Sequence, residues 1–181
     1  DGVIGLVGGV AWIIHGSKCV GHGKCAEACP VNAITVGLGD VSRRPDIPVL
    51  SDALETNIPG LYIAGELGGI ALVRNAVEQG RRAVDDIARR LREEPAAKVP
   101  GVRDILVVGA GPAGLASTFH AVELGLDYEA ISLEDVGGTV RKYPRRKLTL
   151  VQAVDIPLHG KLQEAEYEKE FLTDAFARES A

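Results

Sequence analysis

The longest periodic pattern in the chain lies between residues 73 and 91. Apolar or small residues recur there every three or four positions, and arginine and glutamate occupy the opposite face. This spacing predicts an amphipathic helix of about five turns. Its apolar side consists of Val73, Ala76, Val77, Gly80, Val84, Ile87, Ala88 and Leu91.

Shorter apolar runs predict β-strands. They cover residues 10–15, 33–36, 61–65, 104–111 and 128–134. Further helices are expected at residues 25–28, 113–124 and about 163–178. Because strands alternate with helices in the second half of the chain, the pattern favours an α/β fold with a parallel sheet. We expect three parts, at residues 1–50, 51–100 and 101–181.

A glycine-rich loop joins the strand at 104–111 to the following helix. It contains Gly109, Gly111, Pro112, Ala113 and Gly114 in the pattern GxGxxG. The first glycine permits a tight turn, the second lets a pyrophosphate approach the backbone, and the third lets helix and strand pack closely. The N-terminus of the helix then offers free N–H groups to the phosphates. The alternative is a plain strand–turn–helix connection.

Glu134 lies twenty residues after Gly114, where a carboxylate accepts hydrogen bonds from ribose hydroxyls and would repel a 2′-phosphate. Two features favour FAD over NAD as the dinucleotide. The first is the run Gly137, Gly138 and Thr139, which follows Glu134 and would bring a second glycine loop toward the cofactor. The alternative for Glu134 is a surface glutamate at the end of a strand.

The other feature is the stretch ETNIPGLYIAGELGG, residues 55–69. It resembles the closing strand of thioredoxin-reductase-like, FAD-dependent pyridine nucleotide-disulfide oxidoreductases. This resemblance implies a Rossmann-like FAD-binding sheet, with Gly65 and Glu66 facing FAD, and NAD(P)H as the two-electron partner. Glu66 is alternatively an acid at the start of a helix, stabilised by the helix dipole.

The order of these segments is unusual, because the closing strand precedes the glycine loop. The flavin sheet is therefore expected to be permuted or partial: either a circularly permuted domain, or the end of one module followed by the start of the next. The sequence contains no methionine, which favours an internal fragment of a longer polypeptide. It also lacks a C-x-x-C dithiol, so we do not expect thiol–disulfide exchange.

All three cysteines lie within eleven residues. Cys19, His22, Cys25 and Cys29, followed by Pro30, resemble the bacterial ferredoxin run C-x2-C-x2-C-x3-C-P, with histidine in the second position. The resemblance implies a small ferredoxin-like α+β segment that holds an iron–sulfur cluster. A [3Fe–4S] cluster would use the three cysteines, a [4Fe–4S] cluster would recruit His22, and a third alternative places missing ligands outside this chain. Structural zinc and an empty loop are the competing interpretations.

Composition narrows the functional classes. The net charge is −5, with 46% hydrophobic and 25% charged residues, which gives no indication of nucleic-acid binding. No apolar run is long enough for membrane insertion, and clustered cysteines favour a reducing compartment such as the cytoplasm.

The sequence therefore predicts an FAD-dependent NAD(P)H oxidoreductase, as part of a larger protein. It would pass electrons between FAD and the iron–sulfur centre and on to a redox partner protein or domain. A homodimer is compatible with the sequence. The alternative from another class is a non-catalytic nucleotide-binding module whose structural metal loop docks redox partners.

Overall fold

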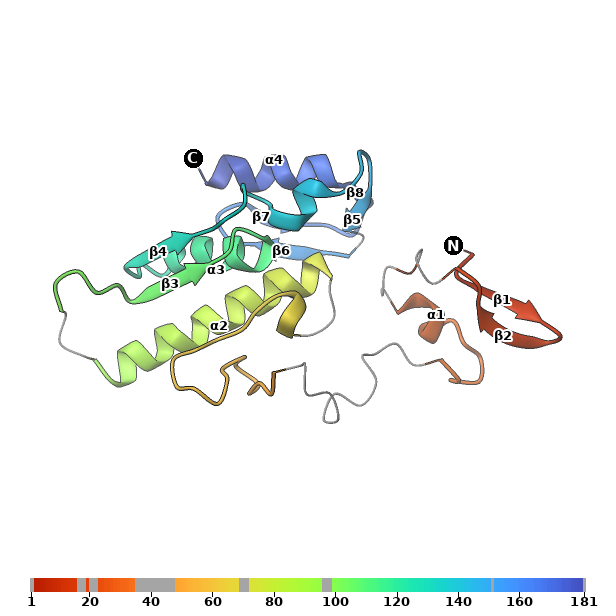
Figure 1. Ribbon diagram of the computed structural model, residues 1–181, viewed down its shortest axis with the longest axis horizontal. Coiled ribbons are helices and arrows are strands. Elements are labelled where there is room, and N and C mark those ends of the chain that lie inside the picture. The colour runs from red at the N-terminus through yellow and green to blue at the C-terminus, as the bar shows by residue number, and fades with distance from the viewer. Residues whose placement is uncertain are drawn as a thin grey trace. The chain divides into compact units, whose positions relative to one another are not determined.

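The computed structural model describes residues 2–15, 19, 23–34, 48–68, 72–95, 99–150 and 152–180. The chain divides into two units, Asp1–Gly37 and Leu38–Ala181, and Figure 1 labels the helices and strands of each. No helix in the described part of the chain combines the length and the apolar character that a membrane span requires.

The first unit contains a β-hairpin and a short helix. Strands β1 (Ile4–Val7) and β2 (Val10–Ile13) pair antiparallel, and α1 (Lys24–Glu27) follows. Gly8 and Gly9 join the strands with φ angles of 59° and 82°, a left-handed conformation that suits a two-residue hairpin turn. The predicted strand and helix are confirmed to within two residues, whereas β1 was not predicted.

The strand predicted at residues 33–36 is wrong where the structure describes it. Ala33 and Ile34 belong to no strand. The N–H of Ala33 donates to the sulfur of Cys29 instead of a strand partner. Residues 35 and 36 lie outside the described residues.

A strand–helix–strand motif forms the centre of the second unit, as predicted. Strands β3 (Ile105–Val108) and β4 (Tyr128–Ile131) flank α3 (Pro112–Glu123) and pair in parallel. Ile105 and Val107 are buried, whereas Leu106 and Val108 on the opposite face are exposed. Among the described residues, this sheet consists of the two strands alone.

The predicted long helix is confirmed as α2 (Val73–Glu93), which packs against α3. Gly80 lies at their crossing, where a Cβ atom would stand 2.3 Å from the carbonyl oxygen of Ala113. The hydroxyl of Ser117 lies within hydrogen-bond distance of the carbonyl oxygens of both residues, at 3.3 and 3.0 Å. The absence of a side chain on Gly80 therefore lets the two helices come close.

The rest of the second unit consists of short elements. They are η4 (Gly138–Lys142), β5 (Leu148–Leu150), β6 (Val154–Ile156), β7 (Gly160–Leu162), β8 (Tyr167–Glu168) and α4 (Lys169–Glu179). The prediction that the last helix begins near Gln163 is wrong, because Leu162 pairs with β6 and Tyr167 pairs with β5. The main core consists of Val77, Leu115, Ala116, Phe119, Leu150, Val154, Ile156, Leu162, Leu172 and Phe176.

Residues 61–65 do not form the strand that the sequence predicts. Tyr62 makes only an isolated antiparallel bridge with Glu55. One edge of this segment bonds to the backbone of residues 54–56, and the segment is no part of the β3–β4 sheet. The segment leads into a short 3-10 helix, η3 (Glu66–Gly68).

Candidate functional site

The loop between β3 and α3 forms the turn that the glycine pattern predicts. Gly109 has a φ angle of 109°, which glycine adopts without strain. Its N–H donates to the carbonyl oxygen of Ile131 at 2.7 Å and ties the loop to β4. Pro112 is the first residue of α3, where its missing N–H has no cost. The N–H groups of Ala113 and Gly114 lie in the first turn, where the helix itself provides no acceptor.

Gly111 and Gly114 are glycine for different reasons. A Cβ atom on Gly114 would stand 1.8 Å from the carbonyl oxygen of Gly109, so close approach of helix and strand requires glycine there. Gly111 has an ordinary backbone conformation, with φ of −77° and ψ of 177°. A Cβ atom on it would meet no atom within 4 Å. Neither backbone nor packing within the described residues requires glycine at this position.

The second glycine pair lies against this loop. The N–H of Gly137, which has a φ angle of 99°, donates to the carbonyl oxygen of Ala110 at 2.9 Å. A Cβ atom on Gly138 would stand 3.0 Å from the Cα of Gly111. Thr139 is exposed. The structure therefore brings together the two glycine loops that the sequence analysis assigned to one cofactor.

Glu134 lies beyond the end of β4 and connects to the same loop through Ser132. The hydroxyl oxygen of Ser132 accepts hydrogen bonds from the N–H groups of Ala110 at 3.2 Å and of Glu134 at 3.1 Å. The carboxylate of Glu134 forms an ion pair with Lys142 and is 39% exposed. The carboxylate is therefore oriented by the protein and open to solvent.

Gly65 lies at the first turn of α3. It has a φ angle of 99°, and a Cβ atom on it would stand 3.4 Å from the Cβ of Ala113. The side-chain oxygen of Gln79, on α2, accepts a hydrogen bond from its N–H at 2.8 Å. Glu66 is exposed at the start of η3, and its charge adds to burial in raising the pKa of Tyr143. Gly65 therefore lies near the first glycine loop, and Glu66 lies near Tyr143, in the turn that follows the second glycine loop.

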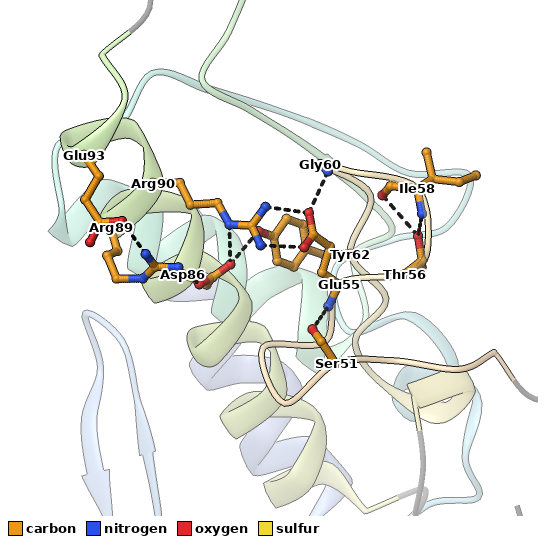
Figure 2. A network of polar contacts seen from close by, with 10 residues as sticks. All are labelled: Ser51, Glu55, Thr56, Ile58, Gly60, Tyr62, Asp86, Arg89, Arg90 and Glu93. Carbon is orange, nitrogen blue, oxygen red and sulfur yellow. Dashed lines mark hydrogen bonds and ion pairs between the residues drawn. The ribbon is translucent and has the colours of Figure 1, made fainter. Parts of the chain in front are cut away.

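A polar network holds residues 55–62 on α2, as Figure 2 shows. Arg90 donates to both carboxylate oxygens of Glu55, and its Nε lies 2.9 Å from Asp86. The hydroxyl of Tyr62 donates to Asp86 at 2.7 Å. Hydrogen bonds from Arg90 lower the pKa of Glu55, the hydrogen bond from Tyr62 lowers the pKa of Asp86, and burial raises the pKa of Tyr62. The ionised carboxylates are therefore the stable form of this network.

The cysteine segment of the first unit is arranged around α1. Gly23, with a φ angle of 76°, precedes the helix, which contains Cys25. Cys25 and Cys29 are half-buried, Cys19 is exposed, and all three are free thiols. Among the residues that the structure describes, no three metal-binding side chains form a ready-made site. His22, the fourth candidate ligand, lies outside the described residues.

The sulfur of Cys29 has the surroundings of a thiolate. The N–H of Ala33 donates to it at 3.3 Å. Hydrogen bonds from backbone N–H groups lower the pKa of the Cys29 thiol. The N–H of Val31 has the largest effect, and that of Ala33 has the next largest. Asn32, with a φ angle of 50°, lies in the turn that aims these groups at the sulfur. Because the thiolate is the form that binds metal, this environment fits a ligand to an iron–sulfur cluster.

Residues 12–35 match the family model of the 4Fe-4S binding domain. The match includes all four candidate ligands and indicates an iron–sulfur, electron-transfer role for this segment. Three free thiols, one of them stabilised as thiolate, are the soft donors that such a cluster requires. A comparison with curated proteins gives no match, and neither does one with solved structures.

Two residues at the glycine loops escaped the sequence analysis. Gln79 holds the backbone of Gly65, and Ser132 links the glycine loop to Glu134. A glutamine on a helix and a serine after a strand are too common to indicate such contacts. Gly80 can be recognised in the sequence, because a glycine on the apolar face of a helix indicates that another helix packs closely against it.

Proposed function

We propose that this chain carries electrons between FAD and an iron–sulfur cluster, with NAD(P)H as the two-electron partner. The observation that supports it most is the open space beside Gly111, a position at which no contact with the described residues requires glycine. The chain also contains a segment that matches the 4Fe-4S binding domain. When bound, FAD supplies the conversion between two-electron and one-electron steps.

The groups around the loop suit a diphosphate. The N–H groups of Ala113 and Gly114 and the positive end of the α3 dipole attract anionic oxygens. Gly109 provides the turn that exposes them, and Gly137 and Gly138 let the second loop approach without side chains. These residues would bind and orient the pyrophosphate of FAD.

The groups on either side suit the rest of a dinucleotide. Glu134, oriented by Lys142 and by the hydroxyl of Ser132, would accept hydrogen bonds from the adenosine ribose. Gly65 would let the cofactor approach the closing segment, and Glu66 is the exposed acid beside it. The thioredoxin-reductase-like family and the Rossmann-like sheet are part of this proposal.

In the first unit, the chain would contribute the cluster ligands. Cys19, Cys25 and Cys29 supply thiolates, and His22 is the candidate for the fourth position. The N–H groups of Val31 and Ala33 stabilise the charge on Cys29.

Anaerobic purification of the 181-residue chain, followed by quantitation of iron, acid-labile sulfide and flavin, tests the proposal. We expect iron and sulfide together with tightly bound FAD. Iron and sulfide without any FAD binding, even after incubation with the free cofactor, would disprove the flavin part alone. Colourless protein that contains zinc would favour the non-catalytic module instead.

A further inference from the structure

A dense group of positive charges lies between η4 and β5 in the second unit. Residues 141–147, Arg-Lys-Tyr-Pro-Arg-Arg-Lys, contain five of the 20 lysine and arginine residues of a chain whose net charge is −5. The first two, Arg141 and Lys142, form ion pairs with acids of the preceding loop. The last three, residues 145–147, are exposed, and no carboxylate forms an ion pair with their side chains in the described part of the chain.

Backbone hydrogen bonds fix the turn that carries these three cations, residues 144–147, which we call the basic turn. The N–H of Lys147 donates to the carbonyl oxygen of Pro144 at 3.2 Å, and the carbonyl oxygen of Lys147 accepts from the first residue of α4 at 3.0 Å. The carboxylate of Glu170 accepts the backbone N–H of Arg146 at 3.2 Å. The side chains therefore extend from a backbone that is already ordered, which lowers the entropy cost of binding.

Arg146 adopts a backbone conformation that suits glycine. Its φ angle is 57°, in the left-handed region that a residue with a side chain adopts only at a cost. Within the described residues, its guanidinium forms no hydrogen bond or ion pair that offsets this cost. The fold therefore does not explain arginine at this position, and a strained residue of this kind points to a binding role.

The size and surroundings of the basic turn favour a protein over a nucleic acid as its partner. Affinity for nucleic acids depends on the number of phosphates that the protein neutralises, and this turn offers three cations. Glu134, Asp135 and Glu170 lie beside them and would repel a longer run of phosphates. The 4Fe-4S binding domain at residues 12–35 also implies a partner protein with which the chain exchanges electrons.

We propose that the basic turn docks an acidic segment of a partner protein. The guanidinium groups of Arg145 and Arg146 bind its carboxylates, because the planar fork of arginine matches two carboxylate oxygens. Lys147, whose ammonium group lies 3.8 Å from the centre of the Tyr143 ring, adds a charge that attracts the segment. The choice of a protein rests in part on the electron-transfer role of residues 12–35, and the proposal does not depend on flavin binding.

The first test titrates the 181-residue chain into a fluorescein-labelled peptide, Gly-Asp-Glu-Tyr-Asp-Glu-Gly, and measures fluorescence anisotropy. The salt concentration is about 100 mM, where charges more than about 10 Å apart are largely screened. We expect saturable binding that Arg145→Gln/Arg146→Gln weakens about tenfold, because two charged donor groups are lost.

Arg92→Gln/Arg178→Gln is the matched control for this titration. It removes the same charge from two exposed arginines near the C-terminal ends of α2 and α4, and it should bind within about twofold of the unchanged chain. Non-saturable binding, or equal weakening by the two double variants, would overturn the proposal.

A second titration distinguishes a protein segment from a nucleic acid. It uses a fluorescein-labelled, single-stranded oligothymidylate of the same net charge as the peptide. We expect the oligothymidylate to bind more weakly than the peptide, because the acids beside the turn repel phosphates. Equal or tighter binding of the oligothymidylate would identify a phosphate site and overturn the assignment to an acidic protein.

A third test separates binding from stability. Arg146→Gly removes the guanidinium and relieves the left-handed backbone, so the variant should unfold at the same or a higher urea concentration than the unchanged chain. It should nevertheless bind the peptide at least about threefold more weakly. A loss of stability would show that Arg146 supports the fold, and unchanged peptide affinity would show that it does not contact the partner; either result would overturn the proposal.

Discussion

Gly65 lies against Ala113, so that a Cβ atom on Gly65 would stand 3.4 Å from the Cβ of Ala113. The resemblance places the first of these residues at the end of a flavin domain and the second at its start. In this chain both belong to one unit and meet at the first turn of α3. The proposed flavin site uses this contact, because it requires the two segments to meet at one cofactor.

The contrast between Gly111 and Gly114 gives the sharpest test of the cofactor site. Gly111→Val should leave stability almost unchanged, because its side chain would enter open space, but should abolish flavin binding by filling the place of the pyrophosphate. Gly114→Ala should destabilise the fold by about 1–3 kcal/mol, because its Cβ collides with the carbonyl oxygen of Gly109.

Urea unfolding and titration with FAD measure the two effects separately. Unchanged FAD affinity of Gly111→Val would refute the site. Equal stability of Gly114→Ala and the unchanged chain would refute the close packing of α3 on β3.

Replacement of a thiolate ligand should remove the cluster. Cys25→Ser should lose most of its iron and sulfide, because the hydroxyl is a harder and weaker ligand for iron. Glu27→Gln, on the same helix, is the control and should keep both. Iron and sulfide analysis after anaerobic reconstitution makes the comparison, and a full iron content in Cys25→Ser contradicts the ligand assignment.

His22→Ala distinguishes the cluster types: retention of a [3Fe–4S] signal in electron paramagnetic resonance would mean that the three cysteines suffice.

The network around Arg90 should make the second unit sensitive to acid. Arg90 holds the pKa of Glu55 below its ordinary value of 4.5, and Tyr62 holds that of Asp86 below 3.8. A carboxyl whose pKa is lower in the folded than in the unfolded protein contributes stability above its unfolded pKa, and this stability is lost as the pH falls through the folded value. Stability should therefore decline below about pH 4.5 as Glu55 and Asp86 take up protons.

Glu55→Gln isolates this contribution. The variant should be less stable than the unchanged chain at pH 7, and the difference should shrink between pH 5 and pH 3, as followed by urea unfolding. Glu166→Gln removes an exposed carboxylate and should keep the unchanged pH dependence. A pH-independent difference between Glu55→Gln and the unchanged chain would show that protonation of Glu55 is not what weakens the network.

The sequence predicts those helices and strands whose hydrophobic or glycine pattern fits only one kind of secondary structure. The 3.6-residue period of α2 fits only a helix, and a glycine loop between a β-branched run and a helix fits β3, α3 and β4. Residues 61–65 were misjudged because a short apolar run has no period of its own, and the backbone partners at residues 54–56 decide its structure.

The sequence predicts the residues of the proposed glycine-loop site but not the side chains that hold these residues in place. Glycines carry their signal in spacing, whereas Gln79 and Ser132 act through single hydrogen bonds that leave no pattern in the sequence. The hairpin partner β1 was missed for a related reason: its apolar residues face both sides, so no alternation marks it as a half-buried strand.

The packing of α4 should affect the second glycine loop as well as stability. A Cβ atom on Gly137 would stand 3.2 Å from Thr173 on α4, so the helix backs the turn that meets Gly111. Phe176, fully buried, anchors this helix in the core. Phe176→Ala should cost about 3–5 kcal/mol of unfolding free energy, and Phe176→Leu less than about 1.5 kcal/mol. Phe171→Ala on the same helix is the control, because its ring is 42% exposed.

Hydrogen exchange at Gly137 and Gly138 completes this test. If α4 positions the loop, Phe176→Leu should speed exchange there before the whole unit unfolds, since local opening reports the loss of a neighbouring contact. Phe171→Ala should leave that exchange unchanged. Phe176→Leu could instead lower the unfolding free energy and leave exchange at the two glycines equal to that of the unchanged chain. This result would mean that α4 contributes only to the core, and that the hydrogen bond from Gly137 to Ala110 alone holds the loop.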